Sequence, residues 1–101
     1  MKRYWLFAGT GQPYGGMGDF QTGSQQVKLL LDWLNKNITN ETLKGIPCTW
    51  FEIVDVNTSL VKVKGDRAFT PVSISDPTIN YYTFDEGKGK WIKLKKNKPS
   101  S

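Results

Sequence analysis

One stretch of the sequence has the apolar spacing of an amphipathic helix. Its apolar residues recur at i, i+3, i+4 and i+7, in the order Val27, Leu30, Leu31 and Leu34. This spacing puts them on one side of a helix, and Leu29 and Trp33 widen the stripe. Ser24 or Thr22 can cap the helix at its start, and we expect it to fray at residues 35–37. The fold should therefore contain one helix that lies flat on a sheet.

The other apolar segments have the composition of β-strands. In residues 3–8, Trp5 and Phe7 share one face and other apolar residues occupy the opposite face, which suits a strand buried on both sides. Residues 50–56 form the clearest strand, because they are rich in β-branched and aromatic side chains. Further strands are expected at residues 60–64, 71–75, 79–84 and 91–95. The order predicts an α+β fold, with one amphipathic helix packed on a mostly antiparallel β-sheet.

The length and the cysteine content limit the domain organisation. A chain of 101 residues with 38% apolar content can build one hydrophobic core. We expect a single compact α+β domain over residues 1–96, followed by a flexible basic tail at residues 97–101. Cys48 is the only cysteine, which excludes an internal disulfide and favours a reducing compartment. The apolar run near the N-terminus is too short for a signal peptide or a membrane span, so we expect a cytoplasmic protein.

The positive charge is concentrated at the C-terminal end. Residues 1–86 contain eight basic and nine acidic residues, whereas residues 87–101 contain six lysines and no acid. Alternation along a strand puts Ile92 and Leu94 on one face and leaves a tryptophan among lysines on the other. The candidates for binding nucleic acid or an acidic partner are Lys90, Trp91, Lys93, Lys95 and Lys96. The alternative is an edge strand whose lysines prevent aggregation, and the scarcity of arginine argues against base-specific readout.

A glycine-rich segment over residues 9–23 interrupts regular structure, with six glycines and one proline in fifteen residues. A strand, a glycine loop and a helix are the elements that nucleotide and phosphate sites use. The spacing nevertheless matches neither the dinucleotide fingerprint nor the phosphate-binding loop. Two interpretations stay open, namely tight turning of a long connection, or contact with a partner or an anionic nucleotide. The binding candidates are Gly11, Tyr14, Gly15, Gly16 and Asp19.

The residue types needed for most catalysis are scarce. The chain contains no histidine, so the usual member of acid–base, nucleophilic and zinc sites is missing. The acids are spread along the chain, where we expect them to be solvated, and alternation places Glu52 and Asp55 on opposite faces of one strand. Cys48 has no nearby cation in the sequence and is expected to be a packing residue. We therefore expect a binding protein rather than an enzyme, with no cofactor and no metal.

Four segments, taken in order, resemble a group of small uncharacterised proteins from phages and bacterial genomes. They are Tyr4–Gly9, Gly15-Gly16, Asp19-Phe20 and, after the helix, Trp50–Asp55. The resemblance covers residues 4–57 and brings no catalytic residue with it, because that group has no established activity. It implies a phage-type accessory protein that stoichiometrically blocks or sequesters a host component in the host cytoplasm, with an anti-CRISPR-like inhibitor of host defence as one form. A nucleic-acid-binding module that uses the basic hairpin is the alternative.

Overall fold

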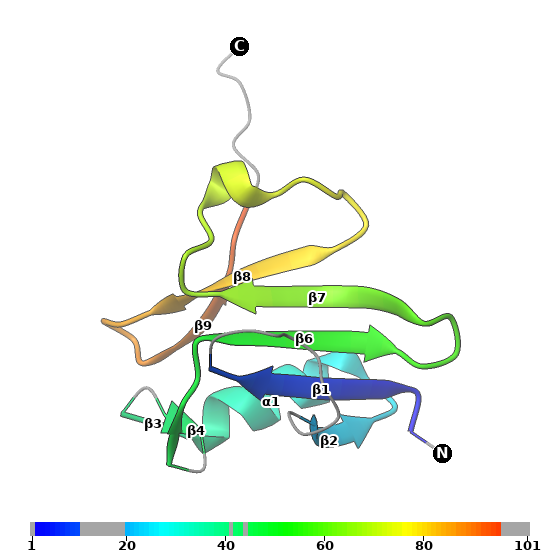
Figure 1. Cartoon of the computed structure of the whole chain (residues 1–101), viewed down its shortest axis with the longest axis horizontal. Helices are drawn as coiled ribbons and strands as arrows, with labels where there is room; N and C mark the ends of the chain where they lie inside the picture. The colour runs from blue at the N-terminus through cyan, green and yellow to red at the C-terminus, as the bar shows by residue number, and fades with distance from the viewer. Residues whose placement is uncertain (1, 11–19, 41, 44, 96–101) are drawn as a thin grey trace.

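The computed structural model describes residues 2–10, 20–40, 42–43 and 45–95. Its main element is a six-stranded sheet with the strand order β2-β1-β6-β7-β8-β9. These strands are β1 (Tyr4–Gly9), β2 (Phe20–Ser24), β6 (Trp50–Asp55), β7 (Leu60–Asp66), β8 (Asn80–Asp85) and β9 (Lys90–Lys93). Helix α1 (Val27–Asn37) lies behind this sheet in Figure 1. The architecture confirms the predicted α+β fold.

The neighbouring strands of this sheet are antiparallel, except that β7 and β8 are parallel. A parallel pair needs a connection that returns the chain to the starting end of the sheet. Residues 67–79 provide it, and they contain the short 3-10 helix η2 (Pro71–Ser73) at the top of Figure 1. A small second sheet follows α1 in the sequence and has three two-residue strands, β3 (Ile38–Thr39), β4 (Thr42–Leu43) and β5 (Ile46–Pro47).

Helix α1 packs on one face of the sheet through Leu30 and Leu34, which are almost completely buried. They belong to a core cluster that also contains Leu6, Ala8, Leu43, Cys48, Phe51, Ile53, Val63, Phe84 and Trp91. The prediction that Leu29 belongs to the buried stripe is wrong, because its side chain is 52% exposed. Trp33, the other residue expected to widen the stripe, does pack against the core. The buried side of the helix is therefore narrower than its sequence pattern indicates.

Alternation along the strands divides the sheet into a face covered by α1 and an opposite face. On β6, Phe51 and Ile53 belong to the core beneath α1, so Trp50 and Glu52 lie on the opposite face. The same alternation places Asp55 on the α1 side, which confirms that Glu52 and Asp55 point apart. Strand β1 has buried residues on both faces, as predicted.

Two segments differ from the sequence prediction. Residues 20–23 fall in the glycine-rich segment, for which no regular structure is expected, but together with Ser24 they form β2, because pairing with β1 satisfies their backbone groups. Residues 71–75 are predicted as a strand, but the 3-10 helix η2 occupies their first part. Pro71 has no N–H for a strand ladder, and Thr70 and Ser73 close a capping box around the turn.

A β-bulge in β7 separates two valines that simple alternation places on the same face. Val54 pairs with Val61, and the preceding residue Ile53 pairs with Val63, so Lys62 is the extra residue of the bulge. Val63 is consequently buried with Ile53 beneath α1, whereas Val61 lies with Val54 on the opposite face. The bulge therefore breaks simple inward–outward alternation within residues 60–64.

Asp55 is completely buried, although the sequence suggests a solvated acid. Its carboxylate accepts a hydrogen bond of 3.0 Å from Arg3 Nη2 and another of 3.0 Å from the backbone N–H of Asn57. The hydrogen bond from Arg3 is the main reason why the pKa of Asp55 is lowered, against the burial that raises it. The carboxylate thus ties the start of β1 to the turn between β6 and β7.

Replacing Asp55 with asparagine should lower the melting temperature at pH 7 by roughly 5–10 °C, because the charge-assisted hydrogen bonds to Arg3 are weakened. The folded-state pKa lies below the ordinary value of 3.8, so this stabilisation is present above that value and is lost as the pH falls through the folded-state pKa. Melting curves from circular dichroism should therefore converge for the two proteins as the pH is lowered from about 5 to about 2. The exposed Asp32→Asn substitution is the control, and an undiminished difference at low pH would contradict the prediction.

Candidate functional site

The basic hairpin consists of strands β8 and β9 and the turn between them, at the left in Figure 1. Trp91, expected on the lysine-bearing surface, is only 2% exposed. Its ring packs edge-on against Phe51 and Phe84, with ring centroids 4.9 and 5.5 Å away. The prediction that Trp91 lies at the surface among the lysines is therefore wrong. The physical reason is that burial among aromatic rings in the core stabilises this large side chain more than exposure on a strand edge.

One side chain of α1 holds the outer edge of β9. Asn35 Oδ1 accepts a hydrogen bond of 2.8 Å from the backbone N–H of Trp91, and Asn35 Nδ2 donates one of 3.3 Å to the Trp91 carbonyl oxygen. The amide thus occupies both backbone groups that Trp91 would offer to a further strand. β9 is the last strand of the sheet. This position agrees with the alternative interpretation of the hairpin, in which lysines on an edge strand prevent aggregation.

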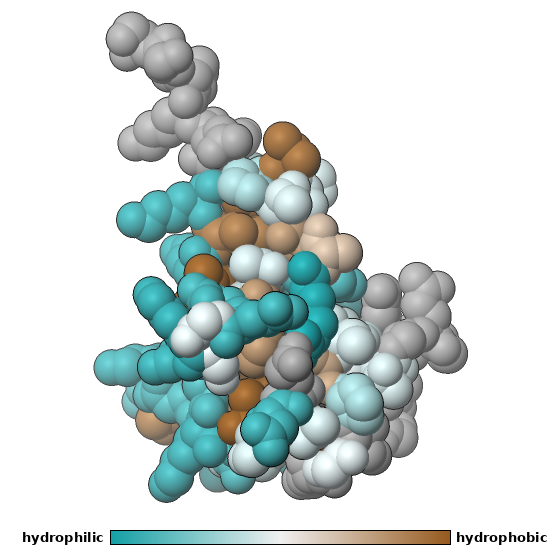
Figure 2. All heavy atoms as spheres, turned by 90° about the vertical axis from the view of Figure 1, so that its left-hand side faces the viewer, coloured by the Kyte–Doolittle hydropathy of each residue, from teal (hydrophilic) through white to brown (hydrophobic). Residues whose placement is uncertain are grey.

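Three lysines on or just after β9 are exposed, namely Lys90, Lys93 and Lys95, and Lys88 is exposed in the turn before β9. Within the described ranges, none of them forms an ion pair with an acid. The tip of the hairpin points toward the side that faces the viewer in Figure 2, where the surface is mostly hydrophilic. The other predicted candidates lie outside the described residues, namely Gly11, Tyr14, Gly15, Gly16, Asp19 and Lys96. Alternation along β9 places Lys93 on the same face as Trp91 and Lys90 on the opposite face, so the exposed lysines follow the edge of the sheet rather than one of its faces.

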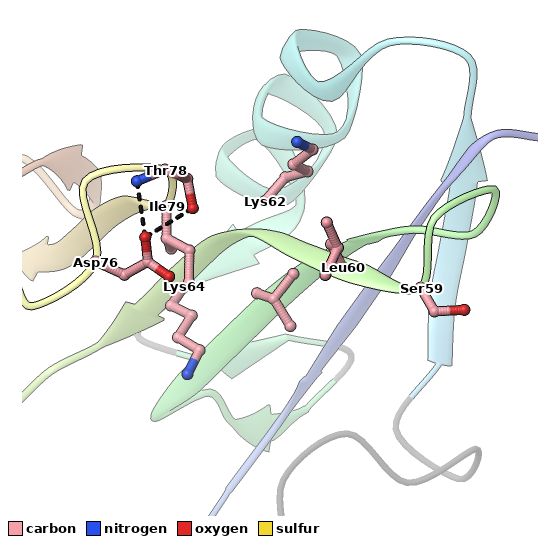
Figure 3. Close-up of a pocket in the computed structure, with 8 residues that line it drawn as sticks. Ser59, Leu60, Lys62, Lys64, Asp76, Thr78 and Ile79 are labelled. Carbon is pink, nitrogen blue, oxygen red and sulfur yellow. Dashed lines mark hydrogen bonds between the residues drawn. The ribbon is translucent and has the colours of Figure 1, made fainter.

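A hollow of about 470 Å³ lies along the first part of β7, next to the residues that precede β8. It is lined by Ser59, Leu60, Val61, Lys62, Lys64, Asp76, Thr78 and Ile79. Asp76 is already satisfied, because its Oδ1 accepts hydrogen bonds of 2.8 and 2.7 Å from the backbone N–H and hydroxyl of Thr78, which lower the pKa of Asp76. Figure 3 shows Lys62 and Lys64 pointing to opposite sides of β7. The polar groups of this hollow therefore do not point toward a common position at which they could hold a ligand.

A smaller hollow of about 180 Å³ lies near the end of β7, on the sheet face opposite α1. It is lined by Trp50, Phe51, Glu52, Lys64, Gly65, Asp66 and Phe69. Glu52 is half-buried, and burial raises the pKa of its carboxyl group while the Lys64 charge acts in the opposite direction. In the part of the chain that the structure describes, no hydrogen bond or ion pair reaches this carboxylate. A partly desolvated carboxylate beside aromatic rings is a feature that a cationic ligand could complement.

Cys48 is almost fully buried, and its thiol lies 3.5 Å from the Trp50 carbonyl oxygen. Burial raises the pKa of the Cys48 thiol to about 11. Arg67 is a nearby cation that the sequence did not reveal, because its Nε donates a hydrogen bond of 3.1 Å to the Cys48 carbonyl oxygen. The Arg67 charge lowers the pKa, but burial is the larger effect. The thiol is therefore protonated at neutral pH and acts as a packing group rather than as a thiolate nucleophile.

Among the described residues, no three cysteine, aspartate or glutamate side chains come together in a way that could hold a metal ion. No helix in the described ranges is long and apolar enough to cross a bilayer. Comparison of the chain with protein-family models, with curated proteins and with solved structures finds no match. The candidate sites therefore rest on geometry, and the resemblance to phage and bacterial proteins stays a prediction.

Proposed function

We propose that this protein acts by binding a partner protein, and that the exposed lysines of the basic hairpin contact an acidic surface of that partner. The observation that carries the proposal is the exposure of Lys90, Lys93 and Lys95 along and just after an edge strand that is fixed to the core. Buried Trp91 and the two hydrogen bonds from Asn35 fix that strand. Because the backbone is already ordered, binding restricts only the lysine side chains and loses less conformational entropy.

A protein partner is favoured over nucleic acid because, among the described residues of the hairpin, no fully exposed aromatic ring accompanies the lysines. Binding of single strands combines positive charge with rings on which the bases stack. Trp91 is buried, and Tyr82, which pairs with Lys93, is half-buried next to the core. Lysines alone attract phosphates without sequence preference, whereas they can complement an acidic protein surface without any stacking ring. A nucleic-acid-binding module that uses the same lysines is the second candidate function.

The resemblance gives this proposal a more specific form, in which the partner is a host protein and the chain is a phage-type accessory protein. Such a protein would block or sequester its partner in a stoichiometric complex, for example a component of host defence. This role requires shape and charge rather than turnover. The buried and protonated thiol of Cys48 supports it, because that group is not available as a nucleophile.

Affinity capture from a bacterial lysate tests the proposal, with bound proteins and bound nucleic acids identified separately. A triple variant, Lys90→Glu, Lys93→Glu and Lys95→Glu, should capture at least about 10-fold less of the partner protein. The reason is that three charges that attract an acidic partner surface are replaced by three that repel it. A matched control makes the same charge change at the exposed Lys2, Lys28 and Lys36 and should capture as much protein as the wild type.

The outcomes separate the two candidate functions. Capture of no protein by the wild type, or equal capture by the hairpin variant, would contradict binding through the basic hairpin. Recovery of nucleic acid alone would support the second candidate function. In that case the affinity should fall steeply when the salt concentration rises from about 50 to about 200 mM, because each phosphate contact releases counterions.

A further inference from the structure

The smaller hollow on the sheet face opposite α1 has the components of a binding site for one cationic side chain. It lies over two neighbouring cross-strand pairs of β6 and β7, in which Trp50 pairs with Asp66 and Glu52 pairs with Lys64. Gly65 lies between the two β7 residues and lines the hollow with its backbone, because a Cβ atom at this position would point to the α1 side of the sheet, toward the Phe51 ring. Phe69, from the connection to β8, adds an aromatic wall. The volume of about 180 Å³ suits one side chain rather than an extended ligand.

The electrostatics of this hollow favour a cation. Glu52 is partly removed from water and, within the described ranges, has neither a hydrogen bond nor an ion pair. An unpaired, partly buried carboxylate is stabilised when a cation binds to it. Lys64 lies opposite Glu52 and its charge acts on both Glu52 and Asp76, but within the described ranges it forms an ion pair with neither. Two acids, Glu52 and Asp66, and one lysine line the smaller hollow, so the formal charge of its lining is negative.

The aromatic walls favour a guanidinium over an ammonium group. A guanidinium is planar and weakly hydrated, so it can stack on a ring while it donates hydrogen bonds to a carboxylate. Both contacts occur elsewhere in this molecule. The Arg67 guanidinium carbon lies 4.4 Å from the centre of the Phe84 ring, and Arg3 binds the Asp55 carboxylate through two nitrogen atoms.

We propose that this hollow binds the guanidinium group of an arginine side chain presented by a partner, with the Glu52 carboxylate as the acceptor and Phe69 as the stacking ring. The site lies on the opposite face of the sheet from α1, and it does not use the lysines of the basic hairpin. This proposed arginine site therefore goes beyond the proposed function, and its test is independent of the test of the basic hairpin.

The test is a titration of the isotopically labelled protein with N-acetyl-arginine amide, followed by nuclear magnetic resonance. The amide signal of Gly65 and the indole signal of Trp50 should shift in a saturable way, with a Kd on the order of 1 mM. N-acetyl-citrulline amide has nearly the same shape without the charge and should bind at least about 10-fold more weakly. Absence of saturable shifts, or equal binding of arginine and citrulline, would overturn the proposal.

Two substitutions locate the interaction. Glu52→Gln should weaken arginine binding at least about 10-fold, whereas the matched control Glu86→Gln, in the exposed hairpin turn, should leave it unchanged. Glu52→Gln should fold, because the charged form of Glu52 is already disfavoured by burial. Phe69→Leu should weaken binding of the arginine probe more than that of N-acetyl-lysine amide, since only the guanidinium stacks on the ring. Equal arginine binding by the wild type and Glu52→Gln would mean that arginine binds elsewhere, which would overturn the proposal. The comparison of arginine with citrulline needs only the wild-type protein, so it tests the proposal even if a variant fails to fold.

Discussion

Replacing Gly65 with alanine is expected to lower the free energy of unfolding by about 3 kcal/mol, although it adds a single methyl group. A Cβ atom at this position would overlap ring carbons of Phe51, the residue that pairs with Gly65 across β6 and β7. The Phe51 ring has little room to move aside, because it also contacts the rings of Trp91 and Tyr82, with centroids 4.9 and 5.8 Å away. Urea unfolding followed by circular dichroism measures the loss.

Gly87→Ala is the matched control for this substitution. Gly87 lies in the exposed hairpin turn, and the nearest atom to an added Cβ is Asp85 Oδ1 at 3.3 Å, so the stability should change little. A double variant tests the cause directly. In a Phe51→Leu background the ring is absent, and Gly65→Ala should therefore cost much less than in the wild type. An equal cost in both backgrounds would mean that the Phe51 ring is not responsible.

Gly65 illustrates why parts of this fold could not be predicted from the sequence. A glycine followed by an aspartate is typical of the end of a strand, and β7 was expected to end at Lys64 for that reason. In the structure β7 continues through Asp66, because the glycine makes room for an aromatic ring on the neighbouring strand. The partner residue, Phe51, is distant in the sequence, so no local pattern reveals the arrangement.

The helix and the principal strands were predictable because local patterns determine them. The spacing of Leu30 and Leu34 specifies the buried side of α1, and the composition of residues 50–56 specifies a strand. The parallel pairing of β7 with β8 was not foreseen, because it depends on how the connection at residues 67–79 folds. The same connection brings Phe69 to the hollow that contains Glu52, so the sequence could not reveal that hollow.

The hairpin shows a second limit of the sequence pattern. In residues 90–95 the apolar side chains occupy both alternating positions of a strand, with Trp91 on one and Ile92 and Leu94 on the other. Alternation alone cannot decide which of these sets faces the core. Two contacts from distant parts of the chain decide it, namely the Phe51 ring and the Asn35 amide, and both involve Trp91.

Replacing Trp91 with alanine is consequently expected to lower the free energy of unfolding by about 3–5 kcal/mol. A domain of this size has a total stability of roughly 5–15 kcal/mol, so the variant should be close to unfolding at 37 °C or unfolded already. The loss arises because the indole fills the space between Phe51 and Phe84 in the core. Urea unfolding of the variant and of Lys93→Ala provides the comparison, and the exposed lysine substitution should change the stability by less than about 0.5 kcal/mol.

The conservative variant Trp91→Phe separates packing from surface chemistry. It keeps a ring against Phe51 and Phe84, and it removes an indole N–H that has no hydrogen-bond partner in the described part of the chain. Its cost should therefore stay below about 2 kcal/mol. If Trp91 instead acted at the surface, Trp91→Ala would leave the stability within about 0.5 kcal/mol of the wild type and abolish binding to single-stranded nucleic acid. The two roles predict opposite results for the same variant, so one unfolding curve and one binding curve distinguish them.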